Sequence, residues 1–232
     1  MTTIHPSTPI LQAVTHDLYR DIHKGIRAEL FSATLAAGRL DPTDRPGRLR
    51  QAEHLAGILD LLVSHAEHED VHVQPEIERH LPDLAERVEL DHLTLDARMQ
   101  DLVGWAEEAA DAQAPQQALA CHRVYLELAS FTSAYLEHQD VEERVIMPAL
   151  ETAIGVDAVV AIHQAIVGSI PPQEMASSLA MMLPVMNVDD RSELLGGMRA
   201  GAPAEVFEGV WALAGSVLDE RDHAAVAARL GL

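Results

Sequence analysis

Aromatic residues make up only 3% of the sequence, whereas alanine, leucine and valine are abundant. A folded core must therefore be built from small and aliphatic side chains, and this composition favours helices. Cysteine occurs once, as Cys121, so no internal disulfide can form. No apolar run approaches the roughly 20 residues of a membrane-spanning helix, and the start, MTTIHPSTPI, lacks the basic and apolar regions of a secretory signal. We expect a cytoplasmic protein without a membrane partner.

Basic residues are also scarce: 16 lysines and arginines face 37 aspartates and glutamates, which gives a formal net charge of -21. Such a chain repels phosphate backbones and anionic lipid surfaces, so nucleic acid is not an expected partner. Histidine, in contrast, occurs 13 times. Because histidine is the commonest metal ligand in proteins, the spacing of these residues decides what the sequence can predict about function.

The periodicity of apolar residues predicts four long amphipathic helices separated by short, turn-rich connections. Consecutive long helices joined in this way favour an all-α, up-down-up-down four-helix bundle. We place this bundle within residues 8–154, with Pro75 either bending or closing its second helix. The expected helices cover residues 8–38, 48–78, 84–110 and 118–152.

Residues 155–232 differ in character, because short helical stretches are broken by prolines and glycines. Their apolar residues still recur at helical spacing, so we expect a folded helical extension that packs on the bundle. The alternative is that this extension pairs with a second chain, which leaves both a monomer and a homodimer open.

One motif occurs twice, as His65–Pro75 in the second expected helix and as His138–Pro148 in the fourth. Both copies read H-x-x-x-E-[DE]-x-x-x-x-P, and a single histidine, His23 or His92, lies on the helix before each copy. The sequence is thus a duplicated helical hairpin. Any one of these residues, taken alone, would be read as an ordinary polar position on an amphipathic helix.

The spacing within the motif suits metal binding. Residues four apart on an α-helix lie about 6 Å apart along the axis and on nearly the same face, so His and Glu can converge on one ion. Two such copies bring four imidazoles and two carboxylates to the centre of a bundle, which predicts a pair of metals rather than one. If both glutamates bridge, open positions remain for small exogenous molecules.

The arrangement H, HxxxE, H, HxxxE resembles the hemerythrin-like HHE cation-binding family over residues 10–152. The resemblance implies two iron ions bridged by carboxylates and oxo or hydroxo groups, with manganese or zinc as alternative metals. It also implies binding of O2, hydrogen peroxide or NO, with catalase-like, peroxidase-like or oxidase turnover; the alternatives are an iron or oxygen sensor and a metal store. The ligands implied by this resemblance are His23, His65, Glu69, His92, His138 and Glu142.

The sequence departs from oxygen-carrying hemerythrins, which have an HxxxH pair on the third helix and an HxxxxD pair on the fourth. Here Asp96 follows His92 at the fourth position, and Glu143 follows Glu142 directly. One histidine ligand is therefore missing. Because hard anionic ligands favour the ferric state, we expect poor reversible oxygen carriage.

Further residues are predicted to surround the ligands without binding metal. Asp96 and Glu143 are expected to act as outer hydrogen-bond acceptors, and His68 as a polar neighbour of the site. His16 and His72 each lie seven residues from a predicted ligand. They are either unrelated histidines or a facing pair along an entry path, and His16 is the substitute ligand should His23 not bind.

Overall fold

The computed structural model describes residues 11–232, and it confirms the predicted all-α fold with additional C-terminal helices. The contacts divide the chain into two compact units. The bundle unit contains the residues up to Tyr19 and Glu29–Ile166, and the extension unit contains Arg20–Ala28 and Val167–Leu232. Among the described residues, the bundle unit contains eight helices, of which the first and the last extend into the extension unit. They are α1 (Arg20–Arg39), α2 (Arg45–His72), α3 (Gln74–His80), α4 (Pro82–Asp111), α5 (Gln117–Val141), the π-helix η1 (Glu142–Ile146), α6 (Met147–Ile154) and α7 (Val156–Ser169).

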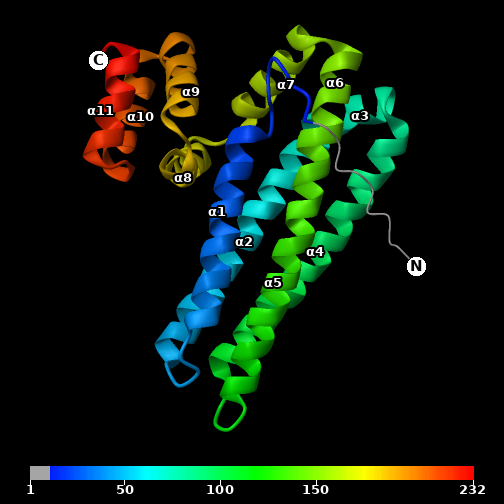
Figure 1. The fold of residues 1–232 in the computed structure, drawn as a ribbon, viewed down its shortest axis with the longest axis vertical. Helices are drawn as coiled ribbons and strands as arrows, with labels where there is room; N and C mark the ends of the chain where they lie inside the picture. The colour runs from blue at the N-terminus through cyan, green and yellow to red at the C-terminus, as the bar shows by residue number, and fades with distance from the viewer. Residues whose placement is uncertain (1–10) are drawn as a thin grey trace. The chain divides into compact units, whose positions relative to one another are not determined.

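The second half of α1 forms a bundle with α2, α4 and α5, which run side by side (Figure 1). The Nε2 amide of Gln51 on α2 donates to the Ala33 carbonyl oxygen, and Thr34 lies 3.2 Å from Thr132 on α5, hydroxyl to hydroxyl. Helix α4 packs against both α2 and α5. Each helix therefore contacts two neighbours, as an up-down-up-down bundle requires.

Two groups of buried side chains close one end of the bundle unit. Ile146 and Leu150 pack with Val73 and Ile77 of the α2–α3 region and with residues of α4. Val159 of α7 packs with Tyr19 and Met147. Gly155, at φ 84°, turns the chain between α6 and α7, where a residue with a Cβ would be strained. The boundary expected near residue 154 coincides with this turn, whereas the compact units separate after Ile166.

Three helix boundaries differ from the predicted ones. The first helix begins at Arg20 and not at Thr8: residues 11–19 are almost entirely non-helical, and Thr8–Ile10 lie outside the described residues. The backbone N–H groups of Thr15 and His16 donate to the Glu151 carboxylate, so a long-range contact overrides the local periodicity. The second helix, which Pro75 was expected to bend or close, is divided into α2 and α3, and Pro75 occupies the first turn of α3.

The predicted fourth helix is divided into α5, η1 and α6. Pro148 has no N–H group and occupies the first turn of α6, so the hydrogen-bond pattern changes just before it. Within η1, the Met147 N–H donates to the Glu142 carbonyl, five residues back. Such π-helical turns often occur at functional sites, and this one contains a predicted ligand.

The extension unit consists of Arg20–Ala28 together with α8 (Pro172–Met182), the short 3₁₀ helix η2 (Leu183–Val185), α9 (Val188–Gly201), α10 (Ala204–Val217) and α11 (Glu220–Leu230). Its core contains Leu179, Leu183, Leu195 and Val226, and Ile22 packs against this core. Asp190 forms ion pairs with Arg20 and Lys24. The extension is therefore folded, as predicted, and it encloses the first half of α1.

Among residues 11–232, no single helix is long and apolar enough to cross a membrane; α5–α6 and α7 pass such a test only together, as a pair bent by 115°.

Candidate metal centre

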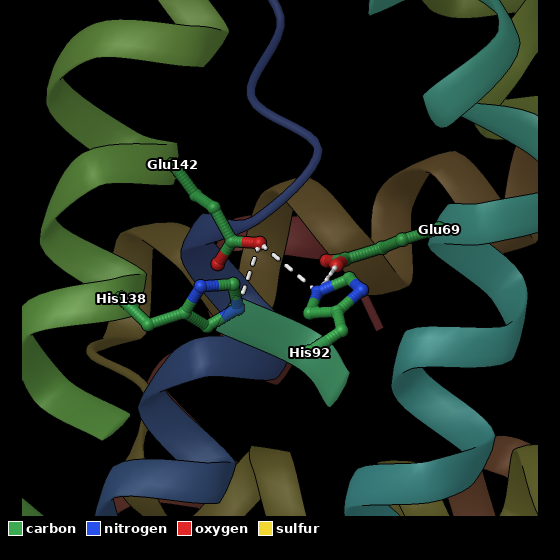
Figure 2. A group of neighbouring side chains, drawn as sticks. All are labelled: Glu69, His92, His138 and Glu142. Carbon is green, nitrogen blue, oxygen red and sulfur yellow. Dashed lines mark ion pairs between the residues drawn. The ribbon is translucent and has the colours of Figure 1, made fainter. Parts of the chain in front are cut away.

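Four buried side chains from three helices and the π-helix converge in the bundle unit. Glu69 comes from α2, His92 from α4, His138 from α5 and Glu142 from η1 (Figure 2). One nitrogen or oxygen of each lies within 4.8 Å of those of the other three, which is close enough to hold a metal ion. His138 Nε2 lies 3.1 Å from Glu142 Oε1, and His92 Nε2 lies 3.3 Å from Glu69 Oε2.

The carboxylate of Glu69 lies between two histidines. Its Oε1 is 3.1 Å from His65 Nε2, and its Oε2 is 3.3 Å from His92 Nε2. Neither oxygen makes a hydrogen bond to any residue in the described range, because these close approaches lack the required alignment. A buried carboxylate without hydrogen bonds is costly, and a cation between the oxygens and the ring nitrogens would remove that cost. The donor set, nitrogen and oxygen only, fits iron, manganese or zinc.

The motif spacing produces this geometry directly. His65 and Glu69 are one turn apart on α2, and His138 and Glu142 are one turn apart where α5 meets η1. In both pairs the nearest nitrogen and oxygen are 3.1 Å apart. A proline follows each glutamate after six residues and ends the regular helix there, so the two halves of the site repeat in structure as in sequence.

The metal-free centre has unusual proton affinities. Burial and the charge of Glu142 raise the pKa of Glu69 well above its ordinary value, although His92 opposes this shift. Burial lowers the pKa of His92, but the Glu142 and Glu69 carboxylates outweigh burial and raise that pKa to about 11. In the metal-free protein, the two buried carboxylates therefore share a single positive charge, that of the protonated His92 ring.

Two acidic residues to which the motif assigned no role lie beside the outer nitrogens of the histidine rings, and Asp70 is close enough for a hydrogen bond. Asp70 Oδ1 lies 3.2 Å from His92 Nδ1, and Asp91 Oδ2 lies 3.8 Å from His138 Nδ1. Each acid adjoins one predicted ligand in the sequence and faces the histidine of another helix. A carboxylate at Nδ1 favours the tautomer whose Nε2 lone pair points to the site, which is how proteins commonly fix histidine ligands.

Two buried tyrosines lie close enough to the centre to feel the charges of its carboxylates. Tyr135 packs against His138, with 5.7 Å between the ring centroids. Burial raises the pKa of Tyr135, and the charges of Glu142 and Glu69 raise it further. Burial followed by the same two carboxylates raises the pKa of Tyr19, which the sequence analysis did not single out. Tyr125, in contrast, lies beside Gly38.

His23 is fully buried, and the segment Arg20–Ala28 that carries it belongs to the extension unit. Its role as a ligand therefore stays a prediction from the motif. His68 and His72 are half-buried on α2, and Glu143 is half-buried on η1. Burial raises the pKa of Asp96, and among the described residues it does not join the group around His92.

His16, which we expected either to be unrelated to the site or to face His72, has a close partner on α7. Its Nε2 lies 2.7 Å from Nδ1 of His163. His163 was overlooked in the sequence because it lies outside the repeated motif. The pairing follows from the path of residues 11–19, which lie along α6 and α7 rather than continue α1.

The profile of the hemerythrin HHE cation-binding domain matches residues 14–150, which contain the whole duplicated motif. The chain belongs to this family. No curated protein and no solved structure matches it. For this HHE protein the family establishes a cation-binding domain, and the converging His and Glu side chains are its candidate site.

The raised pKa of His92 predicts how the stability of the metal-free protein depends on pH. Protonated His92 stabilises the folded state fully below its unfolded pKa of about 6.5, and this stabilisation is lost as the pH rises through about 11. Glu69 also makes the folded state less stable as the pH rises, because its raised pKa means that the folded state favours the protonated carboxyl group. We expect the free energy of unfolding to fall by about 2 kcal/mol between about pH 6 and about pH 9.

Denaturant unfolding in the presence of a chelator measures this change. A His92→Gln variant is the control, and it should show a flatter dependence on pH. Bound metal should reverse the trend, since the ligands release protons on binding. A metal-free protein that becomes more stable toward about pH 9 would contradict the proton-sharing arrangement.

Proposed function

We propose that this HHE protein holds two iron ions and reacts with O2, hydrogen peroxide or NO, as a scavenger of oxidants. One observation supports a pair of metals above all: the two oxygens of Glu69 face different histidines, His65 and His92. A carboxylate placed in this way suits bridging, with one ion at His92, His138 and Glu142 and the other at His65. His23 would complete the second position.

Each residue has a defined task in this proposal. The imidazoles and carboxylates would bind the ions, Asp70 would orient the ring of His92 through Nδ1, and Asp91 places a negative charge near Nδ1 of His138. The iron pair would supply electrons to the bound molecule. Burial of all four converging side chains excludes bulk water. A site with four histidines and two carboxylates favours the oxidised ions. Asp96 stands where oxygen carriers have a fifth histidine, and an aspartate has no nitrogen to offer. The proposal therefore does not include reversible oxygen carriage.

The test combines metal analysis with optical spectroscopy. We expect about two irons per chain and rapid oxidation of the anaerobically reduced protein by peroxide or air, without colour loss on degassing. The absence of bound iron in protein purified from iron-rich medium would overturn the proposal. Reversible oxygenation over several cycles would instead show that four histidines suffice for oxygen carriage.

A sensor is the second candidate, and one observation favours it. His23 belongs to the segment Arg20–Ala28, which packs with α8–α11, so metal binding at His23 would act on the extension unit directly. Limited proteolysis with and without iron tests this role. Protection of residues 167–232 by iron would support sensing, and an unchanged cleavage pattern would exclude it. In either role we propose a cytoplasmic protein that acts on small molecules.

A further inference from the structure

Gln139 is a fully buried amide next to the candidate metal centre. It follows His138 on α5, and its exposed fraction is 0%. Neither its Nε2 nor its Oε1 makes a hydrogen bond within the described part of the chain. Buried side-chain amides are nearly always paired, because an unpaired one carries its full desolvation cost. The group that satisfies Gln139 is therefore not among residues 11–232.

The position of Gln139 is not dictated by the repeated motif. The equivalent residue in the first copy, one position after His65, is Ala66. A small apolar residue is thus compatible with the ligand geometry of an HxxxE turn. The two halves of the site therefore differ here, and only the second half carries a long polar side chain.

Helix geometry places Gln139 beside the ligands of that half. It lies one turn from Tyr135 and one turn from Glu142, so the three share a buried face of α5 and η1. Long helical side chains lean toward the N-terminus, which brings the Glu142 carboxylate over the turn containing His138 and Gln139. Successive residues differ by about 100° around the axis, so His138 and Gln139 flank that carboxylate.

His138 occupies the flank that faces α4, where its ring meets His92 with 4.9 Å between the centroids. The angular spacing of an α-helix assigns Gln139 to the other flank of the Glu142 carboxylate. A small molecule bound there would lie beside Glu142, away from the imidazoles of His92 and His138. It would find a neutral amide that offers both an N–H donor and a carbonyl acceptor.

We propose that Gln139 hydrogen-bonds the exogenous ligand of the metal centre and selects peroxide over NO. Hydrogen peroxide has both donors and acceptors that match an amide, whereas NO is a poor acceptor and has no donor. This inference rests on the proposed iron centre and names the substrate class that its geometry prefers. The competing explanation is that Gln139 binds only a structural water.

Gln139→Met tests the proposal, because methionine preserves the length and helix propensity of the side chain and removes both polar atoms. The metal-loaded, oxidised full-length protein is titrated with azide, an anionic probe that accepts hydrogen bonds. We expect azide to bind about tenfold more weakly than to the unsubstituted protein, which corresponds to about 1.4 kcal/mol for a hydrogen bond to a charged ligand. The rate of peroxide reaction should fall by a similar factor, with the NO reaction unchanged.

Gln51→Met is the matched control, since Gln51 is buried and donates to Ala33 far along the bundle from the motif glutamates. This variant should be less stable and should bind azide normally. Metal content and thermal unfolding of the metal-free protein are measured for both variants. Gln139→Met should keep its metal and unfold at no lower temperature, because it loses only an unpaired amide.

Three results would overturn the inference. Unchanged azide affinity in Gln139→Met would assign the amide to a structural water. Loss of metal from this variant would show that Gln139 supports the ligands and not the exogenous molecule. A lack of metal in the unsubstituted protein would remove the proposed function itself, and metal analysis distinguishes that failure from the other two.

Discussion

Replacing Glu69 by alanine is expected to abolish binding of both metal ions. The two oxygens of Glu69 face His65 and His92, so its loss removes a ligand from each proposed position at once. Glu142→Ala should have nearly as large an effect, because Glu142 approaches both His138 and His92. The metal content measured after gel filtration should therefore fall from about two ions per chain to well below one.

Glu69→Ala should also stabilise the metal-free protein. A buried carboxylate that lacks hydrogen bonds opposes folding, and its removal leaves His92 with one carboxylate instead of two. Glu67→Ala is the matched control, since Glu67 is exposed on the same helix and should change neither property. Two retained ions in Glu69→Ala would exclude a bridging role, and destabilisation of its metal-free form would contradict the electrostatic account.

The convergence of the motif side chains could be predicted because it depends on local geometry. The i to i+4 spacing fixes His138 against Glu142, and the following proline fixes where the regular helix ends. The duplication then implies a second, equivalent pair at His65 and Glu69. None of these inferences requires knowledge of how distant segments pack.

The parts that were missed all depend on packing between distant segments. Residues 11–19 have a helical pattern but lie along α6, because Glu151 accepts their backbone N–H groups. This path places Tyr19 near the carboxylates and pairs His16 with His163. Periodicity reports which face of a segment is apolar, and it cannot report that a carboxylate 135 residues away competes for the same backbone groups.

Glycine and proline breaks led us to expect a domain boundary near residue 154, where Gly155 turns the chain between α6 and α7. Helix α7 follows Gly155 and buries Val159 completely against Tyr19 and Met147. Ile162 and Ile166 cover the group around Ile146 and Leu150. A helix that looks like part of the extension in sequence thus completes the core of the bundle unit.

Because α7 completes the core of the bundle unit, the stability of a shortened chain should depend on whether it keeps this helix. A chain ending at Thr152 loses α7, and each buried aliphatic side chain that it supplies stabilises the fold by roughly 1.5–3 kcal/mol. Val159 is fully buried and Ile162 and Ile166 are partly buried, so together they contribute a few kcal/mol, a substantial part of the roughly 5–15 kcal/mol that a domain possesses. We expect this chain to be largely unfolded or aggregated, as judged by circular dichroism and gel filtration.

A chain ending at Ser169 is the matched comparison, because it keeps α7 and removes only α8–α11. Its bundle unit should unfold cooperatively. The segment Arg20–Ala28 would nevertheless lose the core that covers Ile22, the side chain of Met181 against Gly25, and the Asp190 ion pairs. Since this segment carries His23, we expect metal to bind about tenfold more weakly than in the full chain, the effect typical of lost support around a ligand. Equal stability of the two shortened chains would show that α7 contributes nothing to the bundle core. Full metal affinity in the longer one would show that α8–α11 do not hold His23 in place.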